Sequence, residues 1–276
     1  MTIRNIPDDM APEAVAQVDA ILATIRREEG VHIPLAVESG SRAWGFPSPD
    51  SDYDGRFLYV RPARQALTIW PRRDVIETPL VGDMDVNGWD LSKALRLLLK
   101  GNAVVVEWLQ SPILYTAEPW FRDELLAFAD QWLDRDMVLT HYLHLGRRQK
   151  VLYLDDQSAV SLKKVFYVLR PAVALRWLRL HPDKAVAPMH LPTLMAECDP
   201  PGDLVETVEE LRALKAMTRE MGKGTMPPSI LSFIETEFAA ADPGERSFIP
   251  RSADAERAAD ELFARVTLRL DGLSPG

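Results

Sequence analysis

The fold of this chain is constrained most by one stretch near its N-terminus. It opens with an apolar segment, HIPLAVE at 32–38, that runs into Gly40 and Ser41 and predicts a buried strand ending in a turn. The segment 45–51, GFPSPDS, is rich in Pro, Gly, Ser and Asp and predicts a loop. Residues 56–60, RFLYV, predict a second strand. A strand, a Gly-Ser turn, a loop and a second strand therefore follow one another directly.

Two acidic residues, Asp52 and Asp54, stand between the loop and the second strand. At the start of a strand, side chains at i and i+2 point to the same face, about 7 Å apart. Two carboxylates this close repel each other, and a divalent cation between them turns that penalty into binding. Hard oxygen ligands favour Mg²⁺ or Mn²⁺, and a single cysteine, Cys198, excludes a multi-cysteine zinc site. In isolation, an Asp-x-Asp pair is more often two solvated residues of a turn than a metal site.

Gly40 and Ser41 change the interpretation of that acidic pair. A glycine and a small hydroxyl residue at a strand-to-helix turn let backbone N–H groups approach a phosphate, and the N-terminus of the following helix favours an anion. The order of these elements brings a phosphate cradle beside a metal-binding carboxylate pair. That combination indicates phosphoryl or nucleotidyl transfer.

The rest of the first half predicts a small α/β unit. Apolar residues at helical spacing predict a helix over 12–29, and short strands are expected at 75–77 and 84–86. Asp90 stands where an N-cap belongs, ahead of a strongly helical segment. We expect the unit to end near Tyr115.

The second half of the chain shows no convincing strand. Long helical patterns occupy 120–184, and further helices are expected at 203–217 and 253–270, with a Pro/Gly segment between the last two. We therefore expect an α+β fold. A small domain with a mixed sheet and flanking helices would span residues 1–116, and an all-helical domain would span 117–276.

Composition limits the class of protein. The 276 residues hold 32 Lys and Arg against 41 Asp and Glu, which gives a net charge of −9 and disfavours a non-specific nucleic-acid binder. The N-terminus lacks an apolar signal region and no apolar run reaches the ~18 residues of a membrane span, so we expect a soluble cytoplasmic protein without a membrane partner. Nine Lys and Arg against three acids between residues 140 and 184 form a basic island, either a solvated helix face or an RNA contact.

The text SGSRAWGFPSPDSDYDGRF at 39–57 resembles the signature of the DNA polymerase β-like nucleotidyltransferase superfamily, a Gly-Ser followed by an Asp-x-Asp and a third acid on a later strand. Together with VNGWDLSKALRLLLKGNAVVVEWLQSP at 86–112, it resembles the predicted nucleotidyltransferases of the YcgL type. That bacterial and phage branch includes enzymes linked to RNA-repair operons. The resemblance is strong over 35–115, and it carries little information about the substrate.

The resemblance implies roles for the residues of the motif. Gly40 and Ser41 would hold the triphosphate of an incoming NTP, and Asp52 and Asp54 would bind Mg²⁺ or Mn²⁺. Two such ions would support an in-line displacement at the α-phosphate that releases pyrophosphate.

The third acid should lie on a strand that antiparallel pairing brings beside the acidic pair. Asp85 would sit in the middle of its strand, where its side chain could reach the metals and accept a proton from the acceptor hydroxyl. Asp90 is the alternative, but its expected role as an N-cap already explains it. We prefer Asp85.

Five further residues are candidate nucleotide ligands. Arg42 follows the Gly-Ser pair and is as well explained as an exposed structural arginine. Asn102 belongs to a pattern that related sequences repeat, and a helix C-cap is its alternative role. Lys163, Tyr167 and Arg170 fall at i, i+4 and i+7 near one face of a helix, where a closing helical domain would supply charge to phosphates and a ring to a base.

The sequence thus predicts a metal-dependent nucleotidyltransferase that moves an NMP from an NTP to an acceptor hydroxyl. An RNA or tRNA end is the favoured acceptor because of the family resemblance and the basic island. One alternative is a non-catalytic nucleotide-binding or antitoxin-like interaction protein. Another is NMP transfer to a protein side chain.

Overall fold

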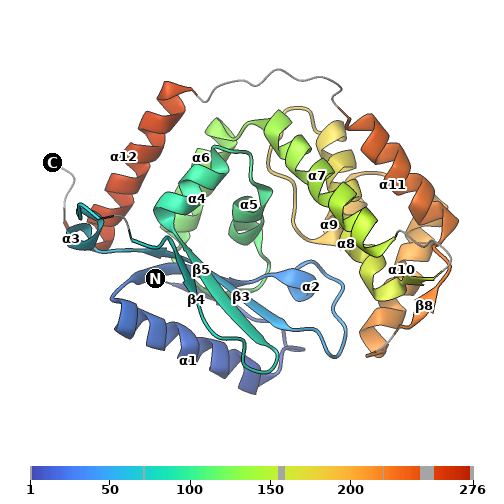
Figure 1. Cartoon of the computed structure of the whole chain (residues 1–276), viewed down its shortest axis with the longest axis horizontal. Coiled ribbons are helices and arrows are strands. Elements are labelled where there is room, and N and C mark those ends of the chain that lie inside the picture. The colour runs from blue at the N-terminus through green and yellow to red at the C-terminus, as the bar shows by residue number, and fades with distance from the viewer. Residues whose placement is uncertain (1, 71, 155–158, 220, 243–251, 274–276) are drawn as a thin grey trace.

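The computed structural model describes residues 2–70, 72–154, 159–219, 221–242 and 252–273. A six-stranded sheet, ordered β1-β6-β2-β3-β5-β4, lies in the first half of the chain (Figure 1). Neighbouring strands are antiparallel except β3 and β5, which run parallel, so the sheet is mixed. The strands are β1 (Ile3–Asn5), β2 (His32–Glu38), β3 (Tyr53–Val60), β4 (Val75–Glu77), β5 (Met84–Asp90) and β6 (Leu114–Ala117).

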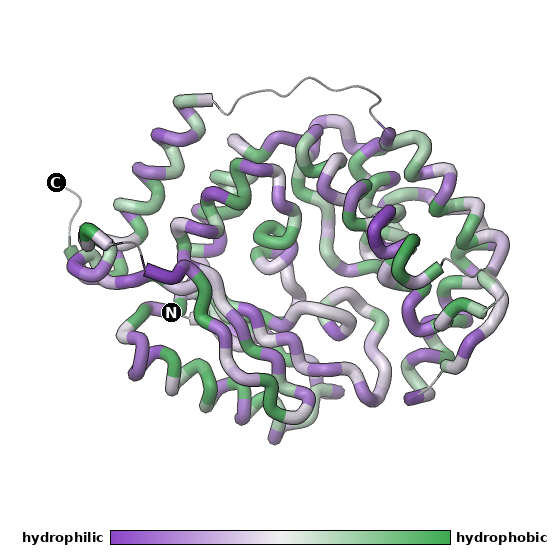
Figure 2. The backbone as a smooth tube through the Cα atoms, in the orientation of Figure 1, coloured by the Kyte–Doolittle hydropathy of each residue, from purple (hydrophilic) through white to green (hydrophobic). Residues whose placement is uncertain are grey.

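One face of the sheet is covered by α1 (Pro12–Glu29). The helix is amphipathic, as the alternating green and purple of its tube in Figure 2 shows. Its buried Val18 and Leu22 pack in one cluster with Phe57 of β3 and Val86 of β5. The predicted helix over 12–29 is confirmed.

The opposite face of the sheet carries α4 (Leu91–Leu98) and α5 (Ala103–Gln110). Successive side chains of β3 alternate between faces, so Leu58 belongs to the core on this side while Phe57 belongs to the core under α1. Asp90 caps α4, because its Oδ1 accepts a hydrogen bond from the Ser92 N–H at 2.9 Å. The N-cap predicted at Asp90 is confirmed.

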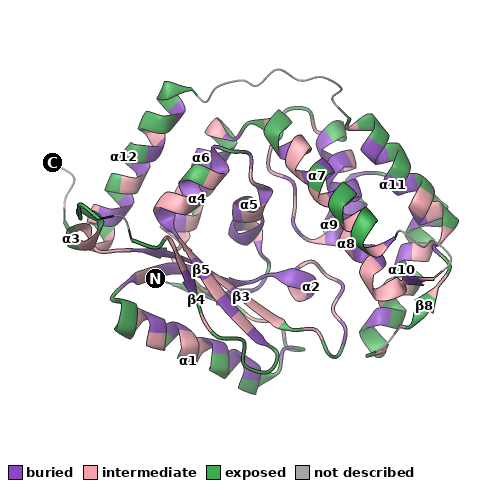
Figure 3. Cartoon of the chain, in the orientation of Figure 1, coloured by how far each residue is buried: buried purple, intermediate pink, exposed green. Residues whose placement is uncertain are grey.

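The second half of the chain is built mainly of helices around α8 (Leu162–Leu180), which is buried along most of its length. Figure 3 shows exposed residues on the outer helices and buried ones in the sheet. No helix among the described residues combines the length and apolar character needed to cross a membrane. The other helices are α2 (Gly40–Ala43), α3 (Ala63–Ala66), α6 (Pro119–Trp132), α7 (Arg135–Tyr153), α9 (Leu191–Glu197), α10 (Gly202–Met217), α11 (Pro228–Ala240) and α12 (Ala253–Leu270).

The last helix returns to the first half of the chain. Figure 1 shows α12 beside α3 and α4, far from α11. Arg265 and Arg269 pair with Glu124 of α6, and Asp271 accepts a hydrogen bond from the Ala63 N–H at 2.7 Å. The domain division at residue 117 stays a prediction, and α12 contacts elements on both sides of it, α4 before and α6 after.

The expected α+β fold, with a mixed sheet followed by a helical part, is confirmed. Two details of the second half are wrong. The Pro/Gly segment contains α11, because Pro228 occupies the first turn of the helix, where proline needs no hydrogen-bond partner. Two short strands, β7 (Val160–Ser161) and β8 (Lys223–Gly224), also pair with each other, and two-residue strands leave no periodic pattern in a sequence.

Candidate active site

The turn from β2 into α2 lies directly against the acidic pair. Gly40 adopts φ +61°, and a Cβ built on it would overlap the carboxylate of Asp54. The Ser39 N–H donates to the Asp54 carbonyl at 2.9 Å. Only glycine combines this backbone conformation with this close approach. The structure therefore brings the predicted phosphate-binding turn and Asp54 together.

Hydroxyl groups tie the turn to the loop that precedes the acidic pair. Ser41 is buried, and its Oγ donates to Ser51 Oγ at 2.9 Å. Ser51 Oγ also accepts from the Ser48 N–H at 2.9 Å. These contacts order the Pro-rich loop between β2 and β3.

Arg42 orders the same loop from the other side. Its guanidinium donates to the Ser51 carbonyl at 2.7 Å and to the Asp52 carbonyl at 3.2 Å. It also lies over the Tyr53 ring, 4.1 Å from the ring centroid. Arg42 thus fixes the backbone beside Asp52, whose own side chain is exposed.

Asp54 and Asp85 are direct neighbours on the parallel strands β3 and β5. The pairing expected for the third acid was antiparallel, and that expectation is wrong: β4 forms the antiparallel hairpin with β5 and lies at the sheet edge. The parallel register nevertheless brings Asp85 beside Asp54. Asp90 lies at the far end of β5, as the cap of α4.

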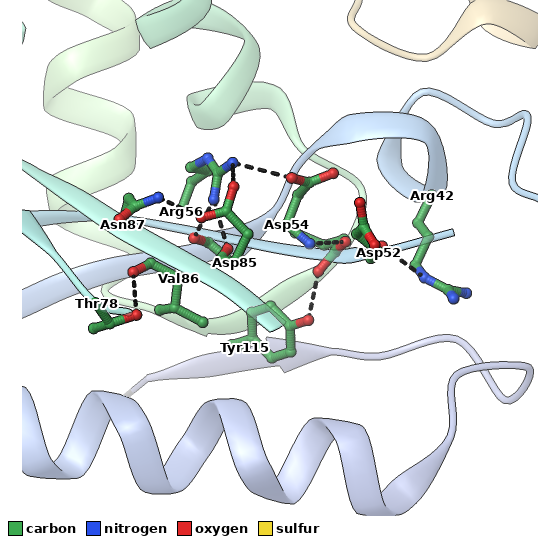
Figure 4. A network of polar contacts seen from close by, with 11 residues as sticks. Arg42, Asp52, Asp54, Arg56, Thr78, Asp85, Val86, Asn87 and Tyr115 are labelled. Carbon is green, nitrogen blue, oxygen red and sulfur yellow. Dashed lines mark hydrogen bonds and ion pairs between the residues drawn. The ribbon is translucent and has the colours of Figure 1, made fainter. Parts of the chain in front are cut away.

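Arg56 bridges the two carboxylates, as Figure 4 shows. Its Nη2 lies 3.0 Å from Asp54 Oδ1 and 2.7 Å from Asp85 Oδ2, and its Nη1 donates to the Asp85 carbonyl at 2.6 Å. Asn87 donates to Asp85 as well. Burial raises the pKa of Asp54, while Arg56 opposes the rise and Asp85 and Asp52 add to it. Arg56 therefore keeps two adjacent acids together.

Glu38 lies beneath the site and is fully buried. Its Oε1 accepts from the Asp54 N–H at 2.8 Å, and its Oε2 accepts from the Tyr115 hydroxyl at 2.5 Å. Burial raises the pKa of Glu38 to about 7, although both hydrogen bonds favour the charged form. Glu38 thus positions the backbone of Asp54.

The sequence reasoning missed both Glu38 and Arg56. A signal for each was present in the sequence. Glu38 is an acid at the end of an apolar strand, immediately before the Gly-Ser turn. Arg56 is two residues beyond Asp54 and so shares its face of the strand.

Tyr167 of α8 faces the acidic pair from the helical half. Burial raises its pKa to about 12, and the negative charges of Asp54 and Asp52 contribute to the rise. Its ring meets Trp44 edge-on at 5.9 Å, and Lys164 Nζ lies 4.8 Å from its centroid. An aromatic ring and an ammonium group therefore lie side by side at this end of α8.

Lys163 connects the two halves of the molecule. Its Nζ forms an ion pair with Asp50 at 2.8 Å, in the loop before the acidic pair. Lys163 and Tyr167 are thus both brought to the site, with Lys163 already paired.

Arg170 and Asn102 have structural partners instead. Arg170 is buried and bonded to Glu107 at 2.8 and 3.2 Å, which Tyr142 also contacts at 2.9 Å. Asn102 is the N-cap of α5, with its Oδ1 accepting from the Val104 N–H at 2.8 Å, and not a C-cap. Neither side chain is free to meet a ligand at Asp54 without losing these bonds.

The basic island between residues 140 and 184 is largely neutralised inside the protein. Among the described residues, six of its nine cations form ion pairs with carboxylates: Arg147, Lys150, Lys163, Arg170, Arg176 and Arg179. Glu237, fully buried, pairs with two of them. Most of this charge serves helix packing.

Comparison with known proteins agrees with the geometry of the site. Residues 15–265 match the family described as the RNA repair pathway DNA polymerase beta family. The chain is 40% identical over 216 residues to an uncharacterized protein, YcgL, of Bacillus subtilis (strain 168). The aligned region covers 78% of this chain and 82% of that protein. The Gly40 turn, the Asp52-x-Asp54 pair and Asp85 fall inside the matched region. This chain belongs to the RNA repair pathway DNA polymerase beta family.

Proposed function

We propose that this polymerase β-like nucleotidyltransferase moves an NMP from an NTP to an acceptor hydroxyl at an RNA or tRNA end, with Mg²⁺ or Mn²⁺ as cofactor. The observation that carries the proposal is the contact of Gly40 with Asp54, beside Asp85 on the neighbouring strand. A backbone turn suited to phosphate thereby adjoins two acids suited to a cation.

The residues present fit a divalent cation by charge and by donor type. Arg56 already pairs with both Asp54 and Asp85, which shows that positive charge is stabilised between these two acids. In the described part of the chain, no three His, Cys, Asp or Glu side chains are yet arranged around a common point. Asp52, Asp54 and Asp85 would hold the ion, which when bound would activate the acceptor hydroxyl and stabilise the leaving pyrophosphate.

The reaction asks three tasks of the chain's own residues. The N–H groups of the turn at Gly40 and Ser41 would orient the triphosphate. Asp85 would take the proton of the acceptor hydroxyl while the oxygen of that hydroxyl bonds to the α-phosphorus. The bond from that phosphorus to the bridging oxygen breaks, and pyrophosphate leaves. Tyr167 and Lys164 of α8 would contact the base and phosphates from the helical half.

One observation favours a second candidate, a non-catalytic nucleotide binder. A pure binder has little reason to keep adjacent acids that repel each other. Arg56, however, bridges Asp54 and Asp85 and reduces their repulsion without any metal, so the fold can retain these acids for stability alone. The two candidates differ in turnover and not in nucleotide affinity.

The proposal is tested with each α-³²P-labelled NTP, Mg²⁺ or Mn²⁺ and total RNA. Label should enter RNA, and Asp54→Asn should reduce incorporation on the order of 100-fold or more. The exposed Asp83, in the turn before β5, gives the matched control Asp83→Asn, which should retain full activity. Label in protein would indicate that the acceptor is a protein side chain and not RNA. Nucleotide binding without any transfer would establish the non-catalytic binder.

A further inference from the structure

A second basic surface lies away from the acidic pair, on the segment between β3 and β4. The residues from Arg61 to Arg73 include four arginines and no acid, in a chain of net charge −9. Figure 1 shows the start of this segment, α3, beside α12. This charge is separate from the basic island of the helical half.

Part of the segment lines a cavity of about 380 Å³. Four arginines and two aspartates line it, together with Ser92 of α4 and Phe263 of α12. The arginines are Arg61, Arg72, Arg73 and Arg96, and the acids are Asp74 and Asp90. The cavity wall is therefore net positive and of a size that accepts a phosphate with its neighbouring sugar.

The arginines of the cavity are unevenly paired. Arg96 and Arg73 form ion pairs with Asp74 and Glu77. Arg61 has two longer ion pairs, with Glu29 at 3.8 Å and Asp90 at 4.0 Å, and its buried Nε has no hydrogen bond. Arg72 is exposed and forms no ion pair with a carboxylate among the described residues, so its guanidinium is open to a phosphate oxygen.

Exposed apolar side chains adjoin these arginines. Trp70 is 77% exposed, and Leu67 and Ile69 are more exposed still. The other six tryptophans of the chain are buried or half-buried. An indole left in solvent between arginines provides a flat platform for an unpaired base, with cationic groups at hand for the adjoining phosphates.

We infer that this surface, Trp70 with the arginine-lined cavity, binds a single-stranded segment of the RNA acceptor. The inference rests on the proposed function for the acceptor class. In the described part of the chain, six of the nine cations of the basic island form ion pairs, whereas Arg64 and Arg72 of this segment form none. Arg61 follows Asp54 by seven residues along β3, roughly 23 Å. The surface would hold RNA away from the reacting end.

The test measures binding of a fluorescein-labelled, unstructured 12-nucleotide RNA by anisotropy, with EDTA and no NTP. Trp70→Ala should weaken binding about 5- to 100-fold, and Trp70→Phe should restore most of it, since stacking needs only an aromatic face. Arg72→Gln with Arg73→Gln should weaken binding and lower the salt slope by about 1.4, for two phosphate contacts at about 0.7 each.

The matched control is another adjacent arginine pair, Arg147→Gln with Arg148→Gln on α7. It should leave RNA affinity within about twofold. Met217→Ala removes an apolar side chain that is 85% exposed elsewhere and should also be neutral. Because all these side chains are exposed, thermal melting should be unchanged in every variant.

Several outcomes would overturn the inference. They are unchanged binding in Trp70→Ala, a larger loss in the α7 pair, or a Trp70-dependent dimer in place of RNA binding. Since the assay contains no NTP, its result is independent of transfer. RNA binding through Trp70 without incorporation would uphold the surface and reject the enzyme. Incorporation of label by the wild-type protein, together with unchanged RNA binding in Trp70→Ala, would uphold the enzyme and reject the surface.

Discussion

Gly40 lies so close to Asp54 that the carboxylate occupies the space a Cβ at residue 40 would need. The contact joins the turn after β2 to the residue pair Asp54–Asp85 of β3 and β5. It makes the geometry of the acid dependent on a glycine fourteen residues earlier in the chain. The phosphate-binding turn and the acidic pair are therefore one structural unit.

Gly40→Ala should both strain the backbone and displace Asp54. Alanine at positive φ costs about 1 kcal/mol, and the overlap with Asp54 should add a further 1–2 kcal/mol. The matched control is Gly82→Ala, which has a similar φ of +60° and no atom within 4 Å of its Cβ. Chemical denaturation of both variants measures the difference. Equal losses of stability would show that the contact with Asp54 has no cost.

Local sequence patterns predicted the elements around the site well. The strand at 32–38, the helix at 12–29 and the cap at Asp90 all depend on neighbouring residues, and all are confirmed. The Gly-Ser turn and Asp54 come together because β2 and β3 are consecutive and antiparallel. Short-range pairing of this kind can be read from spacing.

The rest depended on relationships that spacing does not encode. β5 pairs with β3 in parallel because β4 is placed outside it, and strand order is a property of the whole sheet. The bridge from Arg56 to Asp85 follows from that register. Arg170 has the spacing of a ligand-facing residue, yet its partner, Glu107, is on another helix and more than sixty residues away.

Arg56→Gln should expose the repulsion between Asp54 and Asp85. Loss of charged hydrogen bonds should lower the free energy of unfolding by about 1–3 kcal/mol in EDTA. Mg²⁺ should restore more stability to this variant than to the wild-type protein, because the cation replaces the lost charge. Melting curves with and without Mg²⁺ measure the effect, with the exposed Arg27→Gln as control. An identical Mg²⁺ response in all three proteins would contradict a cation site at these acids.

Lys215 should make the free energy of unfolding depend on pH between about 7 and 10.5. It is buried beneath Phe46, donating to the Phe46 carbonyl at 2.5 Å. Burial lowers its pKa from 10.5 to about 7, with Lys163 and Lys164 adding to the shift and Asp50 opposing it. The unfolded chain then binds more protons than the folded one between these values. The stability from neutral Lys215 is full above pH 10.5 and is lost as the pH falls to about 7.

Lys215→Met should remove that dependence. Relative to the variant, the wild-type protein should lose at most about 1.4 kcal/mol per pH unit as the pH falls from 10 to 7. Urea unfolding of both proteins across this range gives the difference, in which other titrating groups cancel. A difference that stays constant with pH would mean that Lys215 remains charged throughout.

Arg170→Gln should unfold the helical core before it affects nucleotide binding. Breaking its buried pair with Glu107 should cost about 3–5 kcal/mol, because an uncompensated carboxylate remains among apolar residues. The double variant Arg170→Met with Glu107→Leu removes both charges and should recover most of the stability. Its affinity for NTP should match the wild-type protein, since Arg170 is bonded to Glu107 and lies over Trp44. A loss of NTP affinity in the stable double variant would show that Arg170 contributes to nucleotide binding.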